Sequence, residues 1–117
     1  MEYALKHYGR LDVLDNNIGI ASNVSVVEES EEYWDRVMEI NLKPMFLMSK
    51  YAIPAMISSG DGGSIVNISS ISATRPKGLT AYSTSKGAVL SLTQAMAVDH
   101  GSAVSYTHLT LPTTTIV

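Results

Sequence analysis

The sequence predicts an α/β fold built on a parallel sheet. Short apolar runs typical of strands alternate with longer segments whose apolar residues recur every three or four positions, which is the spacing of a helix. Their order along the chain is helix, strand, helix, strand, helix. Two strands joined by a long helix are expected to pair in parallel through a right-handed crossover. The 117 residues are enough for one domain with a modest core.

The N-terminal part is expected to hold one helix and one strand. Residues 2–9 form the end of a helix that Gly9 closes at its C-terminal cap. A short strand, Leu11–Asp15, follows. Asn16–Gly19 then turns out of the strand, because asparagine and glycine tolerate the backbone angles of such a turn, and a polar loop runs to about Glu29.

The next helix is predicted from Ser30, a good N-cap, to about Ser58. Asn41 lies on its apolar face, where a buried amide needs hydrogen-bond partners. Pro44 lacks an N–H, so the helix should bend or break between Asn41 and Pro44. The apolar face itself is a stripe of residues at helical spacing: Trp34, Val37, Met38, Met45, Met48, Ala52, Ala55 and Met56.

The second strand, Ser64–Ser69, ends in a serine pair at 69–70 and leads through a loop to the last helix, expected at about 80–100. Tyr82 and Lys86 are four residues apart in its first turns and so share one helical face. An ammonium close to a phenol favours the phenolate and lowers the pKa of the phenol. This combination of hydroxyl, amine and serine is suited to proton transfer.

The predicted topology brings these groups to one place. Both strands end at the same sheet edge, so Asn16–Gly19 and residues 69–70 should lie side by side, where open α/β sheets bind ligands. Tyr82 and Lys86 face the same region, and Asn41 joins them if the helix bends as expected. The sequence therefore predicts a single crevice at the carboxyl edge of the sheet.

Composition excludes several classes of function. The net charge of −3 gives no basic surface for nucleic acid or an anionic membrane. No apolar run reaches the ~18 residues of a spanning helix, and no signal peptide is visible. Without cysteine there is no disulfide or thiolate nucleophile, which fits a cytoplasmic location. The three histidines are scattered, so no metal site is expected.

Several motifs in order resemble the short-chain dehydrogenase/reductase family. Asn16-Asn17-Ile18-Gly19 is similar to its Asn-Asn-Ala-Gly turn, and Asn-Ile-Ser-Ser at 67–70 is followed by Tyr-x-x-x-Lys at 82–86. The resemblance covers about residues 2–101. It implies a Rossmann-like, doubly wound parallel sheet, of which residues 1–101 would supply only the central strands and helices.

The resemblance also implies site residues and roles. Tyr82 would exchange a proton with the substrate, Lys86 would lower the pKa of the tyrosine and hold the nicotinamide ribose, and Ser70 would hydrogen-bond the substrate oxygen. Asn41 would hold a water that links Lys86 to solvent. The implied catalytic residues are Asn41, Ser70, Tyr82 and Lys86, and the implied cofactor-binding residues are Asn17, Ile18, Gly19, Tyr82 and Lys86. The cofactor would be NAD or NADP, and the substrate a small alcohol or ketone.

Each of these residues also has a structural interpretation. Tyr82 could be a half-buried aromatic, Lys86 a solvated helix residue, and Asn41 the support of a helix break. Either Ser69 or Ser70 could be the functional serine. Ser70 is preferred because aligning Asn-Ile-Ser-Ser with the family puts the catalytic serine second, although the loop to Tyr82 is then one residue shorter than is common.

The two ends of the chain depart from the family pattern. No Thr-Gly-x-x-x-Gly-x-Gly turn precedes residue 2, so this chain alone is expected to bind cofactor weakly or not at all. Residues 102–117 match nothing in the family and are expected to be an atypical, non-native tail. The alternative is a genuine strand such as Thr107–Leu111.

Two other functions compete with an oxidoreductase. A truncated chain could act only as an association module, since the helices at about 30–58 and 80–100 pair between subunits in this family and would form a homo-oligomer. An unrelated α/β fold could also bind a ligand through the same hydroxyl groups without chemistry.

Overall fold

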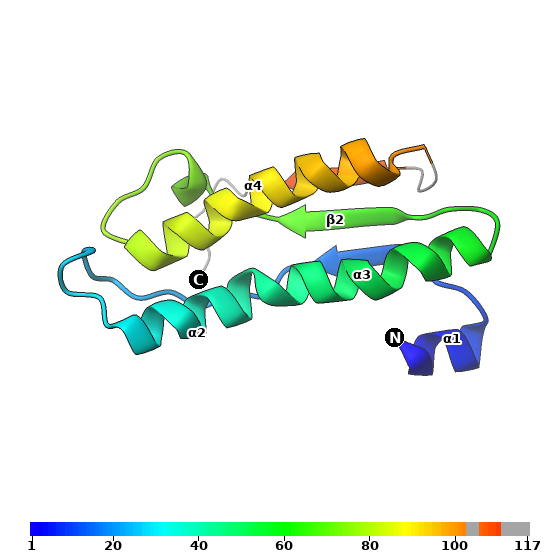
Figure 1. Ribbon diagram of the computed structural model, residues 1–117, viewed down its shortest axis with the longest axis horizontal. Helices are drawn as coiled ribbons and strands as arrows, with labels where there is room; N and C mark the ends of the chain where they lie inside the picture. Colours follow the sequence, from blue (N-terminus) through cyan, green and yellow to red (C-terminus); the bar gives the residue numbers. More distant parts are fainter. Residues whose placement is uncertain (103–105, 111–117) are drawn as a thin grey trace.

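The computed structural model describes residues 1–102 and 106–110 of the chain. Long helices lie along a small sheet, and the N-terminal helix sits at one end (Figure 1). The elements in chain order are α1 (Glu2–Tyr8), β1 (Val13–Asn16), α2 (Glu31–Asn41), α3 (Lys43–Ser58), β2 (Ser64–Ile68), the 3-10 turn η1 (Ile71–Ala73), α4 (Thr80–His100) and β3 (Tyr106–Thr110).

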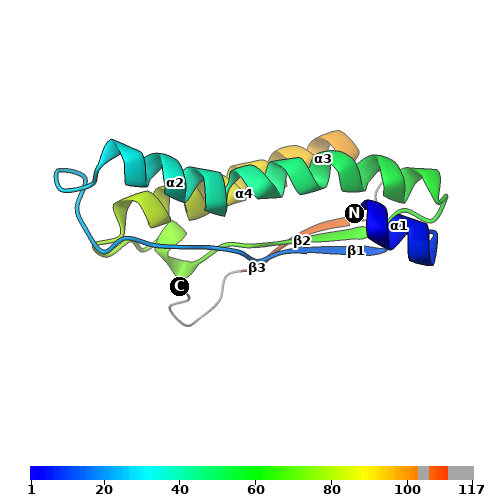
Figure 2. The ribbon, with the colours of Figure 1, turned by 90° about the horizontal axis from the view of Figure 1, so that it is seen from below.

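The sheet has the order β1-β2-β3, and both pairs of strands are parallel. Leu14 of β1 is opposite Ile65 of β2, and Ile65 is opposite Thr107 of β3. Helices α2, α3 and α4 all cover the same face of this sheet (Figure 2). The predicted α/β class and the parallel pairing of the first two strands are thus confirmed.

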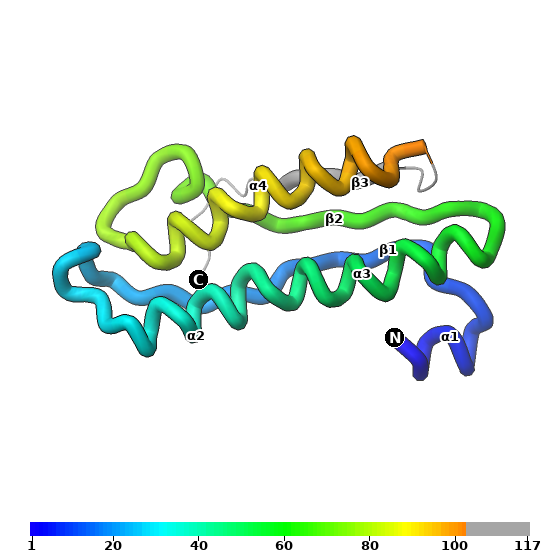
Figure 3. The backbone as a smooth tube through the Cα atoms, in the orientation of Figure 1, coloured from blue at the N-terminus to red at the C-terminus, as the bar shows by residue number. Residues whose placement is uncertain are grey.

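The predicted break in the long helix is present. Ser30 caps α2, since its Oγ accepts a hydrogen bond from the Tyr33 amide at 3.1 Å. Helix α2 ends at Asn41 and α3 begins at Lys43, one residue before Pro44. The break follows from the proline, which has no amide to donate back into α2. The two helices run almost end to end along the sheet (Figure 3).

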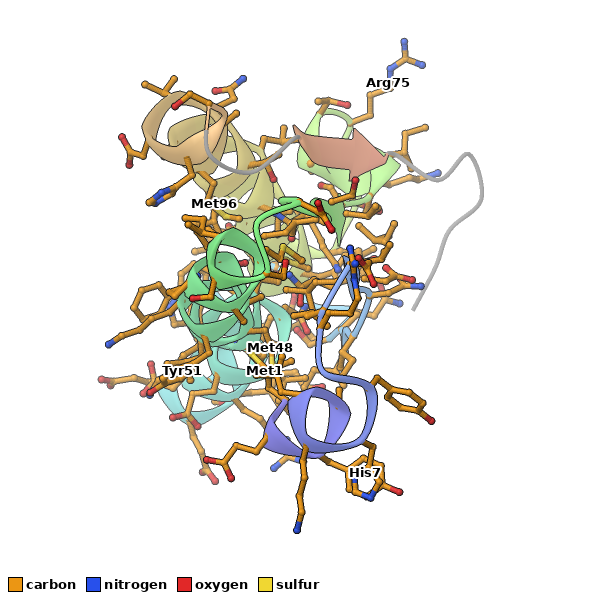
Figure 4. The ribbon with its side chains drawn as sticks, turned by 90° about the vertical axis from the view of Figure 1, so that its right-hand side faces the viewer. Met1, His7, Met48, Tyr51, Arg75 and Met96 are labelled. Carbon is orange, nitrogen blue, oxygen red and sulfur yellow. The ribbon has the colours of Figure 1, made fainter. Side chains whose placement is uncertain are left out.

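The hydrophobic core lies between the sheet and the two long helices. Its buried cluster consists of Leu14, Ala52, Ile53, Met56, Ile65 and Met96. Met96 points from α4 toward α3, whereas Tyr51 points away from the sheet (Figure 4). Met48 was expected on the buried stripe but is 38% exposed. Met48 is not part of the core cluster and instead lines an apolar hollow beside β1 with Ile40 and Pro44.

Part of the predicted atypical tail forms regular structure. Tyr106–Thr110 is β3 and pairs with β2 along its full length. The strand weighed as the alternative, Thr107–Leu111, overlaps β3, and position 111 lies outside the described residues. Whether residues 102–117 are native to the chain stays a prediction. Of the helices in the described part of the chain, none combines the length and hydropathy that crossing a membrane would need.

Candidate active site

Tyr82 and Lys86 lie together at the carboxyl end of β2. Both are buried, with exposed fractions of 2% and 3%. The Lys86 Nζ atom is 5.8 Å from the centroid of the Tyr82 ring, so the two side chains share one face of α4 as predicted. The same Nζ donates a hydrogen bond to the Ile68 carbonyl at 3.1 Å, which anchors the amine to the last residue of β2.

The amine of Lys86 is a buried cation. Burial lowers the pKa of Lys86 from its ordinary value of 10.5, because leaving water disfavours the charged form. Among the residues that the structure describes, no carboxylate forms an ion pair with it. An ammonium has three hydrogens to donate, and the described residues supply one acceptor, the Ile68 carbonyl. Within the part of the chain that the structure describes, the Ile68 carbonyl thus accounts for one of the three hydrogens.

The turn after β1 meets this amine through its glycine. A Cβ atom placed on Gly19 would lie 3.4 Å from both Cε and Nζ of Lys86, and 3.6 Å from Oδ1 of Asn41. The backbone of the turn therefore packs directly against the site. Asn17 and Ile18, the other predicted cofactor-binding residues of the turn, are exposed.

Asn41 is fully buried and uses its whole amide. Its Oδ1 accepts from the Ile20 amide at 2.7 Å, and its Nδ2 donates to the Ile20 carbonyl at 2.8 Å and to Ser85 Oγ at 3.0 Å. The side chain thus fastens the loop after β1 to the end of α2 and to α4. This satisfies the polar group that the sequence places on an apolar face.

The two serines at the end of β2 make different hydrogen bonds. Ser69 Oγ donates to the Lys86 carbonyl at 2.7 Å, so its proton is committed. Ser70 Oγ accepts from the Ser72 amide at 3.1 Å and caps η1. A hydroxyl that accepts still has its own proton to donate, and no acceptor for it occurs among the described residues. This favours Ser70 over Ser69 as the serine that meets a substrate.

Two loops meet at the same end of the molecule as these residues, opposite α1 (Figure 1). The loop after β1 is held by Tyr33, whose hydroxyl donates to the Ala21 carbonyl at 3.1 Å, and by a hydrogen bond from Ser22 to Glu29. Asn23 of this loop approaches Gly78 of the other loop: a Cβ on Gly78 would lie 3.7 Å from its Oδ1. Both loops therefore lie at the carboxyl edge of the sheet, where the sequence predicts the site (Figure 1).

Sequence reasoning missed Ser85, a buried residue that supports the site, and it missed the supporting role of Ser69. Ser85 donates to the Tyr82 carbonyl at 2.7 Å and accepts from Asn41, and Ser69 holds Lys86. The available signal was that Ser85 continues the buried stripe of α4, where a polar residue needs a partner. Within the described residues, no cluster of three His, Cys, Asp or Glu side chains could hold a metal ion.

Comparisons with known proteins identify the family of this chain. The model of the family described as short chain dehydrogenase matches residues 1–114. An uncharacterized oxidoreductase from Thermotoga maritima is 46% identical over 99 residues, which are 80% of this chain and 37% of that protein. Carbonyl reductase (NADPH) 2 from Sus scrofa is 40% identical over 101 residues, 86% of this chain and 41% of that protein.

A solved structure has the same arrangement of elements. It is the 3-ketoacyl-(acyl-carrier-protein) reductase from Brucella melitensis complexed with NADH, 33% identical, with a TM-score of 0.81. The alignment covers 87% of this chain and 44% of that one. The chain thus spans less than half the length of each of these relatives.

Proposed function

Because this chain belongs to the short-chain dehydrogenase family, we propose that it carries the acid–base half of a nicotinamide-dependent oxidoreductase site. The reaction interconverts an alcohol and a carbonyl compound. A bound NAD or NADP supplies or accepts the hydride. The observation that carries the proposal is the burial of Tyr82 and Lys86 together at the carboxyl edge of the sheet, with the Lys86 amine against Gly19.

The donor set fits a nicotinamide ribose. A ribose offers adjacent hydroxyl oxygens, and the Lys86 ammonium has two hydrogens without an acceptor among the described residues. The Gly19 backbone lies against the same amine, since a Cβ atom placed on it would be 3.4 Å from Nζ. Lys86 and the turn at 16–19 would hold the cofactor. NAD and NADP are equal candidates here.

Tyr82 is the proposed proton donor and acceptor. In reduction its Oη gives a proton to the carbonyl oxygen as the carbonyl carbon receives hydride, and in oxidation it takes the proton from the alcohol. The Lys86 ammonium stabilises the negative charge that develops on the phenol during donation. Ser70 donates its hydroxyl proton to the substrate oxygen and holds that oxygen in place. Asn41 keeps Ile20 and Ser85 in position around the pair.

Cofactor titration followed by NMR tests the binding part of the proposal. We expect millimolar NADH or NADPH to shift the signals of Gly19, Ser70 and Lys86 with saturation, and Lys86→Met to abolish these shifts. Lys50→Met, which removes an exposed lysine on α3, is the matched control and should leave them unchanged. Shifts that spread over the surface without saturation would argue against a cofactor site here.

The exposed face of the long helices favours a second proposal, association between copies of the chain. Phe46 and Tyr51 of α3 are 50% and 60% exposed. A hollow of about 370 Å³ between α3 and α4 is lined by Phe46, Pro54, Leu92 and Ala95, with Lys50, Asp99 and His100 around it. Apolar side chains rimmed by charges are typical of an interface. We propose a homo-oligomer that pairs these helices.

A further inference from the structure

We propose that Ser69 and Ser85 are positioning residues that fix the Tyr82–Lys86 turn of α4 in place. Each donates its hydroxyl proton to the backbone carbonyl of one of these two residues, at 2.7 Å in both cases. The inference rests on the proposed function only in taking Tyr82 and Lys86 as the acid–base pair.

Ile68 and Ser69 together hold Lys86 at its side-chain amine and at its backbone carbonyl. The Ile68 carbonyl accepts from Nζ at 3.1 Å, and the next residue, Ser69, donates to the Lys86 carbonyl. Two successive residues at the end of β2 thus hold the tip and the backbone of one lysine. Because a long, flexible side chain is fixed at both ends, the amine has little freedom to leave its buried position.

The hydrogen bonds of Ser85 link α4 to Asn41 at the end of α2. The Oγ of Ser85 accepts from Asn41 Nδ2 at 3.0 Å and donates to the Tyr82 carbonyl. Asn41 in turn holds both backbone groups of Ile20. A continuous chain of hydrogen bonds therefore runs from the loop after β1, through the end of α2, to the backbone of Tyr82.

The two tethers, which are the hydrogen bonds donated by Ser69 and Ser85, act on carbonyls inside a helix. A carbonyl oxygen has two lone pairs, so it can accept from a hydroxyl as well as from the helical amide. Ser69, Ser85 and Asn41 are at most 1% exposed, so water cannot replace a lost partner. Removing one hydroxyl should therefore loosen the first turns of α4 without unfolding the rest of the helix.

The test measures two local properties of the 117-residue chain, in Ser69→Ala and in Ser85→Ala. We expect amide hydrogen exchange around residues 82–90 to become roughly three- to tenfold faster, as for the loss of one buried hydrogen bond. Exchange in the last turns of α4 should not change. In Ser69→Ala, NMR titration should show the pKa of Lys86 moving back up toward its ordinary value, because the amine is less firmly buried.

Two variants separate positioning from general packing. Ser49→Ala also removes a buried serine hydroxyl, but that Oγ has no hydrogen-bond partner among the described residues. It should change neither readout. Ser69→Thr keeps the hydroxyl and should restore slow exchange and the lowered pKa of Lys86.

Unchanged exchange and an unchanged Lys86 titration in both alanine variants would overturn the tethers and leave the proposed reaction standing. An ordinary pKa for Lys86 in the parent chain would instead contradict the buried amine on which the proposed reaction relies. If Ser69→Ala does not fold, amide exchange around residues 82–90 in Ser85→Ala tests the proposal alone, and unchanged exchange there would overturn it.

Discussion

At the scale of single residues, the site depends on one buried cation. The pKa of Lys86 is lowered by burial, so the folded chain binds this proton less tightly than the unfolded chain does. Between the lowered folded-state pKa and the ordinary value of 10.5, the unfolded state holds more protons. The free energy of unfolding of the parent must therefore rise with pH across this window.

Lys86→Met removes that dependence. The variant has no charge to bury at neutral pH. Its free energy of unfolding relative to that of the parent is therefore highest there. This stability advantage of the variant over the parent should shrink as the pH rises toward 10.5, because the lowered pKa of Lys86 favours the neutral amine in the folded parent. Urea unfolding of both proteins at pH 7 and near pH 10 measures the two differences.

The control for this pH effect is Lys50→Met, whose exposed lysine lies on α3. Its difference from the parent should be the same at both pH values. A stability difference for Lys86→Met that stays constant between pH 7 and pH 10 would mean that the amine is not buried as a cation.

Some site residues could be predicted from sequence and others could not. Tyr82 and Lys86 share a face because helical spacing alone decides it, and the placement of Asn41 followed from its position before Pro44. The choice between Ser69 and Ser70 needed the structure. Their hydrogen bonds depend on how β2 and α4 pack across a separation of 17 residues in the case of Ser69 and Lys86.

At the scale of elements, a buried chain of polar side chains joins β1, β2 and α4. Asn16 Nδ2 donates to Asn67 Oδ1 at 2.8 Å, and Asn67 Nδ2 donates to Thr93 Oγ1 at 3.0 Å. Thr93 in turn donates to the Val89 carbonyl. These hydrogen bonds fix the register of α4 along the sheet. They thereby fix the position of its first turns relative to the carboxyl ends of the strands.

Thr93→Val should destabilise the chain by about 1–3 kcal/mol, because it leaves the buried Asn67 amide without its oxygen acceptor at nearly constant volume. Urea unfolding measures the change. Thr84→Val replaces an exposed threonine on the same helix and should alter stability by less than about 0.5 kcal/mol. Equal effects of the two substitutions would show that the buried hydrogen bonds of Asn16, Asn67 and Thr93 contribute nothing to stability.

The elements themselves were largely predictable. Capping residues and apolar spacing predicted α1, α2, α3 and α4, and the proline predicted the break. A strand in the region of β3 is the less favoured alternative in the sequence analysis. Its sequence, Tyr106–Thr110, carries few apolar residues, and its pairing with β2 is a long-range interaction that local pattern does not reveal. Met48 was placed wrongly because periodicity shows which residues share a helix face but not how far the sheet extends beneath it.

At the scale of the whole molecule, the exposed face of α3 and α4 should control association. Phe46→Glu puts a charge at the centre of the proposed helix pairing and should raise the dissociation constant of the oligomer about tenfold or more. Sedimentation equilibrium measures it. Tyr8→Glu, an equivalent change on the exposed surface of α1, is the control and should have no effect. A chain that is monomeric at every concentration would rule out the association.

The chain spans 44% of the reductase complexed with NADH, and its affinity for cofactor should reflect that. The phosphate-binding turn that the family resemblance implies does not occur in these 117 residues. We expect calorimetric titration with NADH and with NADPH to show no binding in the low-micromolar range. A low-micromolar dissociation constant would show that residues 1–117 already hold the whole cofactor.

The sharpest measurement concerns Tyr82. Residues 1–101 can replace the matching part of the Brucella melitensis reductase, so that this chain supplies all four proposed catalytic residues: Asn41, Ser70, Tyr82 and Lys86. Turnover of NADH by the chimera is then compared with that of its Tyr82→Phe variant and of Tyr51→Phe, which alters an exposed tyrosine on α3. We predict that Tyr82→Phe lowers kcat by roughly 10²- to 10⁴-fold, the contribution typical of a positioned acid–base group, while Tyr51→Phe has no effect. A folded Tyr82→Phe chimera that turns over as fast as its parent would contradict the assignment of Tyr82 as the proton donor.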